Sequence, residues 1–157
     1  IYPFMKRFTW WPQLFLGIAF NWGVLMGYSA LTGNISSSAG MVYVAAIFWT
    51  VGYDTIYAHQ DREDDALIGL KSSAIRLGDK TQTALWIIYS LSVLCFLTAG
   101  LMAFAGLWFY LIMGVVALHL VWQIINTDIS DNDKCLVVFK SNRNLGFIIM
   151  IAFAFSL

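Results

Sequence analysis

Five long apolar stretches, separated by shorter polar segments, constrain the fold of this chain more than any other feature. They cover, in approximate bounds, residues 14–30, 41–57, 84–105, 107–125 and 145–157. Several approach the roughly 20 residues that a helix needs to cross a bilayer. Because a helix satisfies its own backbone hydrogen bonds in lipid, we expect an all-α, polytopic transmembrane helix bundle with five crossings.

The composition of the chain supports a membrane protein over a soluble one. Hydrophobic residues make up 60% of the 157 residues and charged residues only 11%, whereas soluble domains carry about 25% charged residues. A soluble helical bundle would also show a polar stripe along each helix, and residues 85–97 show none. The formal net charge is zero, so nothing favours binding to nucleic acid.

The basic residues fall into three groups that alternate with uncharged connections. The segments 31–40 and 103–107, which connect successive crossings, carry no charge. Five successive crossings place every second connection on the same membrane face, so all charged segments would lie on one face and the uncharged ones on the other. The positive-inside rule predicts that this face is cytoplasmic, or faces the matrix in a mitochondrion. The three groups are Lys6 and Arg7, then Arg62, Lys71, Arg76 and Lys80, and finally Lys134, Lys140 and Arg143.

Acidic residues concentrate where the second apolar stretch ends. Five of them lie between residues 54 and 65. On a continuous helix, Asp54, Asp61 and Asp65 would project within about 20° of one direction. Stacked carboxylates repel each other unless a cation compensates, and hard oxygen ligands suit Mg²⁺. The pattern therefore predicts a magnesium site at Asp61 and Asp65, with a solvated acidic loop as the alternative.

Basic residues near these acids are candidates for binding an anionic substrate. Lys71 and Arg76 follow the acidic segment, and Lys6 and Arg7 precede the first crossing on the same predicted face. A diphosphate leaving group needs Lys or Arg as well as a metal ion to neutralise its charge. Anchoring by the positive-inside rule is the alternative explanation for each of these residues.

Three polar residues lie inside the apolar stretches. Asn21 interrupts the first stretch, and His119 and Gln123 lie one turn apart in the fourth. Polar side chains at such positions most often form hydrogen bonds between helices, which is the role we expect here.

Two motifs resemble those of a known family. Residues 53–65 read YDTxYAxxDxxDD and residues 68–72 read IGxKS, which resembles the second aspartate-rich motif of the UbiA superfamily of intramembrane prenyltransferases. Residues 2–9, YPFMKRFT, and residues 11–13, WPQ, resemble the segment before the fifth helix in the branch that prenylates 4-hydroxybenzoate.

The resemblance implies a bundle of nine transmembrane helices, of which this chain would supply five. Residues 1–157 would be the C-terminal part of a single prenyltransferase domain, and the first aspartate-rich motif of the family would lie in an N-terminal half that this sequence does not contain. Half of the metal site would then be missing, so we expect the chain alone to be inactive.

The resemblance also implies roles for individual residues. Asp61 and Asp65 would be catalytic and would hold Mg²⁺ on a diphosphate. Arg7 would meet the carboxylate of an aromatic acceptor, for which its planar fork is suited. The remaining implied site residues are Asp54, catalytic and shaping the cavity, and Lys6, Lys71 and Tyr57, which would contact substrate.

The implied activity is Mg²⁺-dependent transfer of a polyprenyl group from polyprenyl diphosphate to the ring of 4-hydroxybenzoate, in ubiquinone biosynthesis. The protein would lie in the lipid bilayer of a bacterial or mitochondrial inner membrane. Two alternatives stay open at this point. One is another branch of the same superfamily, of the haem, menaquinone or chlorophyll type, and the other is a transporter with an acidic cation site.

Overall fold

The computed structural model describes residues 2–155 of the chain, with side chains from Phe4 onward. The motif side chains of Tyr2 and Pro3 and the last two residues of the fifth apolar stretch lie outside this part. The described part is helical and contains no strand. Its elements are α1 (Tyr2–Phe8), α2 (Pro12–Phe20), α3 (Trp22–Thr32), α4 (Ser37–Tyr57), α5 (Arg62–Ile68), α6 (Ser73–Leu77), the 3₁₀ turn η1 (Gly78–Lys80), α7 (Thr81–Met102), α8 (Leu107–Asn126) and α9 (Asn132–Ala154).

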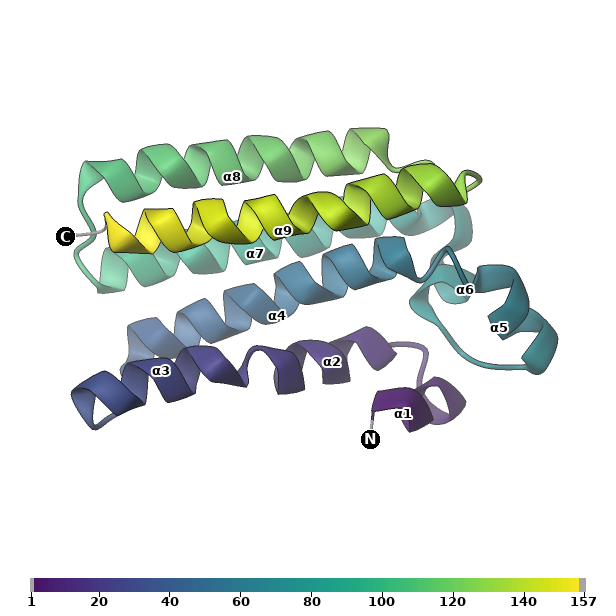
Figure 1. The fold of residues 1–157 in the computed structure, drawn as a ribbon, viewed down its shortest axis with the longest axis horizontal. Coiled ribbons are helices and arrows are strands. Elements are labelled where there is room, and N and C mark those ends of the chain that lie inside the picture. The colour runs from purple at the N-terminus through teal and green to yellow at the C-terminus, as the bar shows by residue number, and fades with distance from the viewer. Residues whose placement is uncertain (1, 156–157) are drawn as a thin grey trace.

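The long helices lie side by side in one bundle, and α1, α5 and α6 gather at one end of it (Figure 1). Five helical spans of the described residues are long and apolar enough to cross a membrane: Pro12–Thr32, Ser37–Tyr57, Ser73–Met102, Leu107–Asn126 and Asn132–Ala154. This confirms the all-α bundle with five crossings that the apolar stretches predict. The mainly apolar surface of these spans is what a bilayer would cover.

The first crossing is interrupted at Asn21, where α2 ends and α3 begins. The side-chain amide of Asn21 donates hydrogen bonds to the carbonyl oxygen of Gly17 at 2.8 Å, to that of Ala46 at 3.3 Å and to the hydroxyl of Thr50 at 2.8 Å. The last two bonds join the break to α4, which confirms the helix-to-helix role predicted for Asn21. Backbone groups released at such a break must find partners inside the protein.

The last crossing begins at Asn132, well before the apolar stretch at residue 145. The carboxylate of Asp131 accepts a hydrogen bond from the backbone N–H of Lys134 at 3.0 Å and so caps the helix. The charge pattern predicts that the third basic group lies outside the crossings on one membrane face, and this prediction was wrong for Lys140 and Arg143, because both lie within α9. The cap at Asp131 lets α9 begin with several polar turns before its most apolar part.

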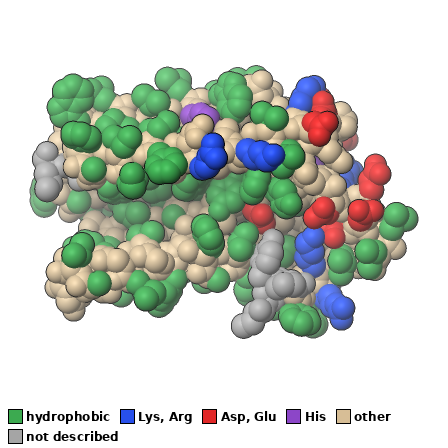
Figure 2. All heavy atoms as spheres, in the orientation of Figure 1, with side chains coloured by type: hydrophobic (Ala, Val, Ile, Leu, Met, Phe, Trp, Pro, Cys, Tyr) green, Lys and Arg blue, Asp and Glu red, His purple; other side chains and the backbone are tan. Residues whose placement is uncertain are grey.

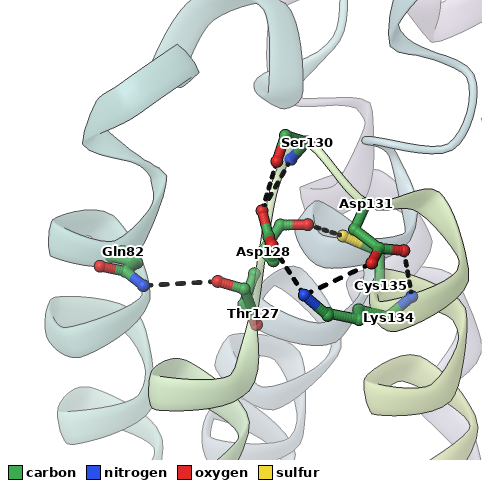
Figure 3. A network of polar contacts seen from close by, with 7 residues as sticks. All are labelled: Gln82, Thr127, Asp128, Ser130, Asp131, Lys134 and Cys135. Atoms are coloured by element: carbon green, nitrogen blue, oxygen red, sulfur yellow. Dashed lines mark hydrogen bonds and ion pairs between the residues drawn. The ribbon is translucent and has the colours of Figure 1, made fainter.

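The turn between α8 and α9 is held by a polar network (Figure 3). Asp128 accepts hydrogen bonds from the backbone and hydroxyl of Ser130 at 3.2 and 2.6 Å, and its other oxygen lies 3.0 Å from the ammonium of Lys134. These bonds to Ser130, followed by the one to Lys134, lower the pKa of Asp128 to about 2. Gln82 of α7 donates to the carbonyl of Thr127 at 3.4 Å, which connects the turn to a third helix.

A second polar network lies in the core between α4, α7, α8 and α9. The amide of Gln123 donates to the side-chain oxygen of Asn142 at 3.0 Å and accepts from the hydroxyl of Tyr89 at 2.7 Å. His119 lies 3.1 Å from the hydroxyl of Ser141. These bonds confirm the roles predicted for His119 and Gln123, and they fix the rotation of α9 against its neighbours.

Candidate active site

The acidic segment is divided between two helices. α4 ends at Tyr57, the chain turns, and α5 begins after Asp61. The prediction that Asp54, Asp61 and Asp65 share one face of a continuous helix was therefore wrong. Three acidic residues in the first turn of α5 favour a helix start here, because negative charge is stabilised at a helix N-terminus.

Asp61 and Asp65 nevertheless keep their one-turn spacing and converge on the same cation. The backbone N–H of Asp65 donates to the carbonyl of Asp61 at 2.8 Å. The ammonium of Lys6 lies 2.8 and 3.1 Å from the two carboxylate oxygens of Asp65, and 3.9 Å from one oxygen of Asp61. Lys6 thus supplies the positive charge that the two carboxylates need. The side chain of Asp61 is 52% exposed and that of Asp65 only 7%.

Asp54 lies on α4, three residues before the end of that helix, and is only 7% exposed. Insertion scales put the cost of a charged Asp in the middle of a membrane helix at about 2.5–3.5 kcal/mol, and the cost falls toward the helix end. Asp54 is buried near this end, and its predicted place beside a cavity stays a prediction.

Lys71 connects the loop between α5 and α6 to α1. Its backbone N–H donates to the carbonyl of Lys6 at 2.7 Å, and its ammonium lies 3.4 Å from the carbonyl of Phe8 and 5.8 Å from the ring centre of Trp10. The backbones of Lys6 and Lys71 therefore meet, while the ammonium of Lys6 faces the acidic segment and that of Lys71 faces Phe8 and Trp10. Arg7 is exposed on α1.

Tyr57 belongs to a row of aromatic side chains between α4 and α9. Its ring centre lies 4.6 Å from that of Phe139, and Tyr53 lies 5.8 Å from Phe139 on the same side. Trp49 continues the row 5.7 Å from Tyr53. From Trp49 to Tyr57 the row covers eight residue steps of α4, about 12 Å at 1.5 Å per residue, and leads from the membrane interior to the acidic segment.

His59 lies in the turn between α4 and α5 and is 3% exposed. Its Nε2 lies 3.1 Å from the hydroxyl of Thr81 at the start of α7. Burial, with the nearby charge of Arg62, lowers the pKa of His59 to about 4. The ring is therefore neutral at neutral pH and holds the turn against α7.

A cavity of about 520 Å³ lies between α2, α4 and α9, beside this aromatic row. Sequence reasoning missed that Lys140 and Arg143 of α9 line it. Figure 2 shows basic side chains over α9 above a hollow with a hydrophobic floor, and most of the visible acidic side chains at the end that carries α5. The helix cap at Asp131 was the signal that could have placed both cations on a helix.

The donor set at Asp61 and Asp65 fits a divalent cation in part. Their oxygens lie on one side, because both face the same ammonium, and Mg²⁺ in substrate sites often takes only one or two carboxylates together with phosphate oxygens. Among residues 2–155, however, three or more metal-binding side chains nowhere come together. A complete site would need further ligands from substrate, water or another segment.

Comparison with known proteins places these features in a family. The model of the UbiA prenyltransferase family matches residues 1–152. Mitochondrial 4-hydroxybenzoate polyprenyltransferases are similar to the chain, with 43% identity in Dictyostelium discoideum and 44% in Homo sapiens, each over 96% of this chain. The 4-hydroxybenzoate octaprenyltransferase of Pseudomonas fluorescens Pf-5 is 42% identical, also over 96% of this chain.

The chain spans only part of these relatives: 33% of the Dictyostelium protein, 41% of the human one and 51% of the bacterial one. No solved structure matches it significantly. The family match nevertheless covers the acidic segment, the basic segment before the first crossing and nearly all of the helical bundle. The chain therefore belongs to the UbiA prenyltransferase family.

Proposed function

We propose that the protein containing this chain transfers a polyprenyl group from polyprenyl diphosphate to the ring of 4-hydroxybenzoate, as a step of ubiquinone biosynthesis. The protein would act in a bacterial or mitochondrial inner membrane, with the acidic segment on the cytoplasmic or matrix side. The observation that carries the proposal is the convergence of Asp61 and Asp65 on the ammonium of Lys6, in a chain 42–44% identical to three enzymes named for this acceptor.

Asp61 and Asp65 would hold Mg²⁺ against the diphosphate of the donor. Bound there, the ion would supply positive charge that stabilises the departing diphosphate. Lys6 would move from the carboxylates to the phosphate oxygens, and Lys71, whose backbone is bonded to that of Lys6, would turn its ammonium from Phe8 and Trp10 to the same oxygens. Loss of the diphosphate leaves an allylic cation, and these cations on the protein favour the bond cleavage by neutralising the leaving group.

The acceptor ring then attacks the allylic carbon, so that a carbon–carbon bond forms, and the attacked ring carbon passes its proton to a nearby base. The aromatic row of Trp49, Tyr53, Tyr57 and Phe139 would line the path of the reacting groups and keep water from the cation. Asp54, buried on α4 in the same part of the bundle, is the further catalytic candidate. Arg7, exposed on α1, would meet the acceptor acid at the aqueous edge.

Replacement of the metal-binding carboxylates tests this proposal. In the full-length protein, Asp61→Asn and Asp65→Asn should each lower the rate of prenyl transfer by at least about a hundredfold, because an amide is a poor ligand for Mg²⁺. Membrane insertion should be unchanged. The measurement is transfer of radiolabelled prenyl diphosphate to 4-hydroxybenzoate at several Mg²⁺ concentrations.

Asp64→Asn is the matched control, because Asp64 is exposed on the same helix and has no described contact with Lys6. Its rate should stay within about threefold of the wild type. Near-normal Mg²⁺-dependent turnover in Asp61→Asn would show that Asp61 does not bind the metal ion. A wild-type protein that prenylates other aromatic acceptors but leaves 4-hydroxybenzoate unchanged would contradict the choice of substrate.

A further inference from the structure

Two cations that have no partner among the described residues line the cavity between α2, α4 and α9. Lys140 and Arg143 lie three residues apart on α9, and neither makes an ion pair or a hydrogen bond with any described residue. Arg143 lies midway along this membrane-spanning helix. Cationic side chains at such depth are rare without an anionic partner and mark binding sites. We propose that Lys140 and Arg143 hold the carboxylate of the aromatic acceptor inside this cavity, an inference that rests on the function proposed above.

The rotation of α9 that presents these two residues is fixed by their neighbour Asn142. The indole N–H of Trp49 donates to its side-chain oxygen at 2.8 Å, and Gln123 donates to the same oxygen at 3.0 Å. These bonds anchor Asn142 to α4 and to α8. Because Lys140 and Arg143 flank an anchored residue, the chain keeps two cations at the cavity instead of letting them turn toward lipid.

The rest of the cavity suits a flat ring. Trp49, Tyr53 and Phe139 contribute aromatic faces, and Asn21 and Thr50 form a polar region on the wall near the helix break. Aromatic faces pack against a benzene ring, and the planar guanidinium of Arg143 matches a carboxylate through two parallel hydrogen bonds. A small aromatic acid uses both properties at once.

The diphosphate of the donor fits this cavity less well. No Asp or Glu is among the described residues that line it, so it offers no carboxylate to hold a metal ion on the phosphates. Those carboxylates are Asp61 and Asp65, at the end of the bundle. The carboxylates proposed to hold the metal ion and the cations proposed to hold the acid therefore lie at different places in the bundle.

Arg7 is the other arginine considered for the acceptor. It is exposed at the end of the bundle and is not among the residues that line the cavity. Arg143 is exposed in this chain too, but it lies midway along a membrane-spanning helix and lines the cavity. At that depth water screens a contact between a guanidinium and a carboxylate less than it does at the aqueous end of the bundle. Arg143 should therefore discriminate between an aromatic acid and its neutral analogue.

The test compares binding of 4-hydroxybenzoate and of its neutral methyl ester to the full-length protein in lipid nanodiscs, without donor. Titration calorimetry should show that the wild type prefers the acid. Arg143→Gln should weaken binding of the acid by about 10- to 100-fold and leave the ester unchanged, which also shows that the cavity is still folded. Lys140→Gln should have the same effect to a smaller extent, and Arg143→Lys should fall between.

Lys134→Gln is the control, because Lys134 lies on the same helix but pairs with Asp128 and Asp131 away from the cavity. In turnover, Arg143→Gln should raise the KM for the acceptor and leave the KM for the donor unchanged. The inference is wrong if Arg143→Gln keeps the preference for the acid, if Arg7→Gln loses it instead, or if the KM for the donor rises alone. A wild type that neither binds nor prenylates the acid would refute the proposed function itself.

Discussion

At the scale of single residues, Lys6 is the side chain that organises the acidic segment. Its ammonium contacts both Asp61 and Asp65, and the carboxylate of Asp65 is nearly buried. A buried carboxylate that loses its cation keeps the cost of desolvation without the compensating attraction. The charge balance of this site therefore depends on one lysine from a helix 59 positions earlier in the sequence.

Removal of this lysine should destabilise the protein before any substrate is involved. We expect Lys6→Gln to lower the free energy of unfolding by about 1–3 kcal/mol, because Asp65 is left without its ion pair. The double variant Lys6→Gln/Asp65→Asn should recover much of this loss, since no buried charge remains. Unfolding in mixed micelles would measure both.

Lys80→Gln serves as the control, since Lys80 is exposed and no ion pair with it is described. If the double variant is no more stable than Lys6→Gln alone, the loss of stability does not come from the ion pair between Lys6 and Asp65.

The pairing of Asp61 with Asp65 was predictable from sequence, whereas the residues that surround this pair were predictable only in part. The spacing of Asp61 and Asp65 survives because it depends on one local helical turn. The position of Asp54 relative to them depends on whether the helix continues through residues 58–60, and spacing alone carries no information on that break. The contact of Lys6 with Asp65 joins two distant segments, so the sequence could indicate only that both lie on one membrane face.

At the scale of helices, hydropathy located every crossing and misplaced some of their ends. α9 begins at Asn132 because Asp131 caps it, although its first turns are polar. The first crossing breaks at Asn21 because that side chain finds partners on α4. Both features depend on hydrogen bonds, and mean hydropathy over a window carries no information on hydrogen bonds.

One close helix contact lies where α4 packs against α7, at Gly52. A Cβ placed there would clash with the ring of Tyr89, whose hydroxyl is bonded to Gln123 and whose side chain is buried. Gly52→Ala should therefore cost about 1–3 kcal/mol of stability through overpacking.

The matched substitution is Gly40→Ala on the same helix. A Cβ there meets no atom within 4 Å, so the better helix propensity of alanine should leave stability equal or slightly higher. Thermal unfolding in detergent compares the two, and equal effects of both substitutions would show that the α4–α7 contact can relax.

At the scale of the whole molecule, one face of the bundle is open. The cavity with Lys140 and Arg143 is bordered by α2, α4 and α9, and the chain spans only 33–51% of the three relatives considered. The number of crossings and the charged end of the bundle could be predicted from sequence, because both depend only on where apolar and charged residues lie along the chain. The cavity could not, because three helices distant in sequence form it together.

The chain alone should enter a membrane but should not transfer a prenyl group. Its five apolar spans suffice for insertion, whereas three metal-binding side chains nowhere meet among residues 2–155. Expression of residues 1–157 should give a carbonate-resistant membrane protein with no detectable transfer of labelled prenyl diphosphate. Coexpression with the N-terminal half of a full-length relative is the companion experiment. Turnover by the chain by itself would show that two carboxylates are enough.

The bond from Lys71 to the backbone of Lys6 has a consequence for motion during turnover. It fastens α1 to the loop after α5, and the ion pair from Lys6 to Asp65 fastens the same two pieces a second time. Any displacement of α1 away from the acidic segment must therefore break both contacts or carry the loop after α5 along with it.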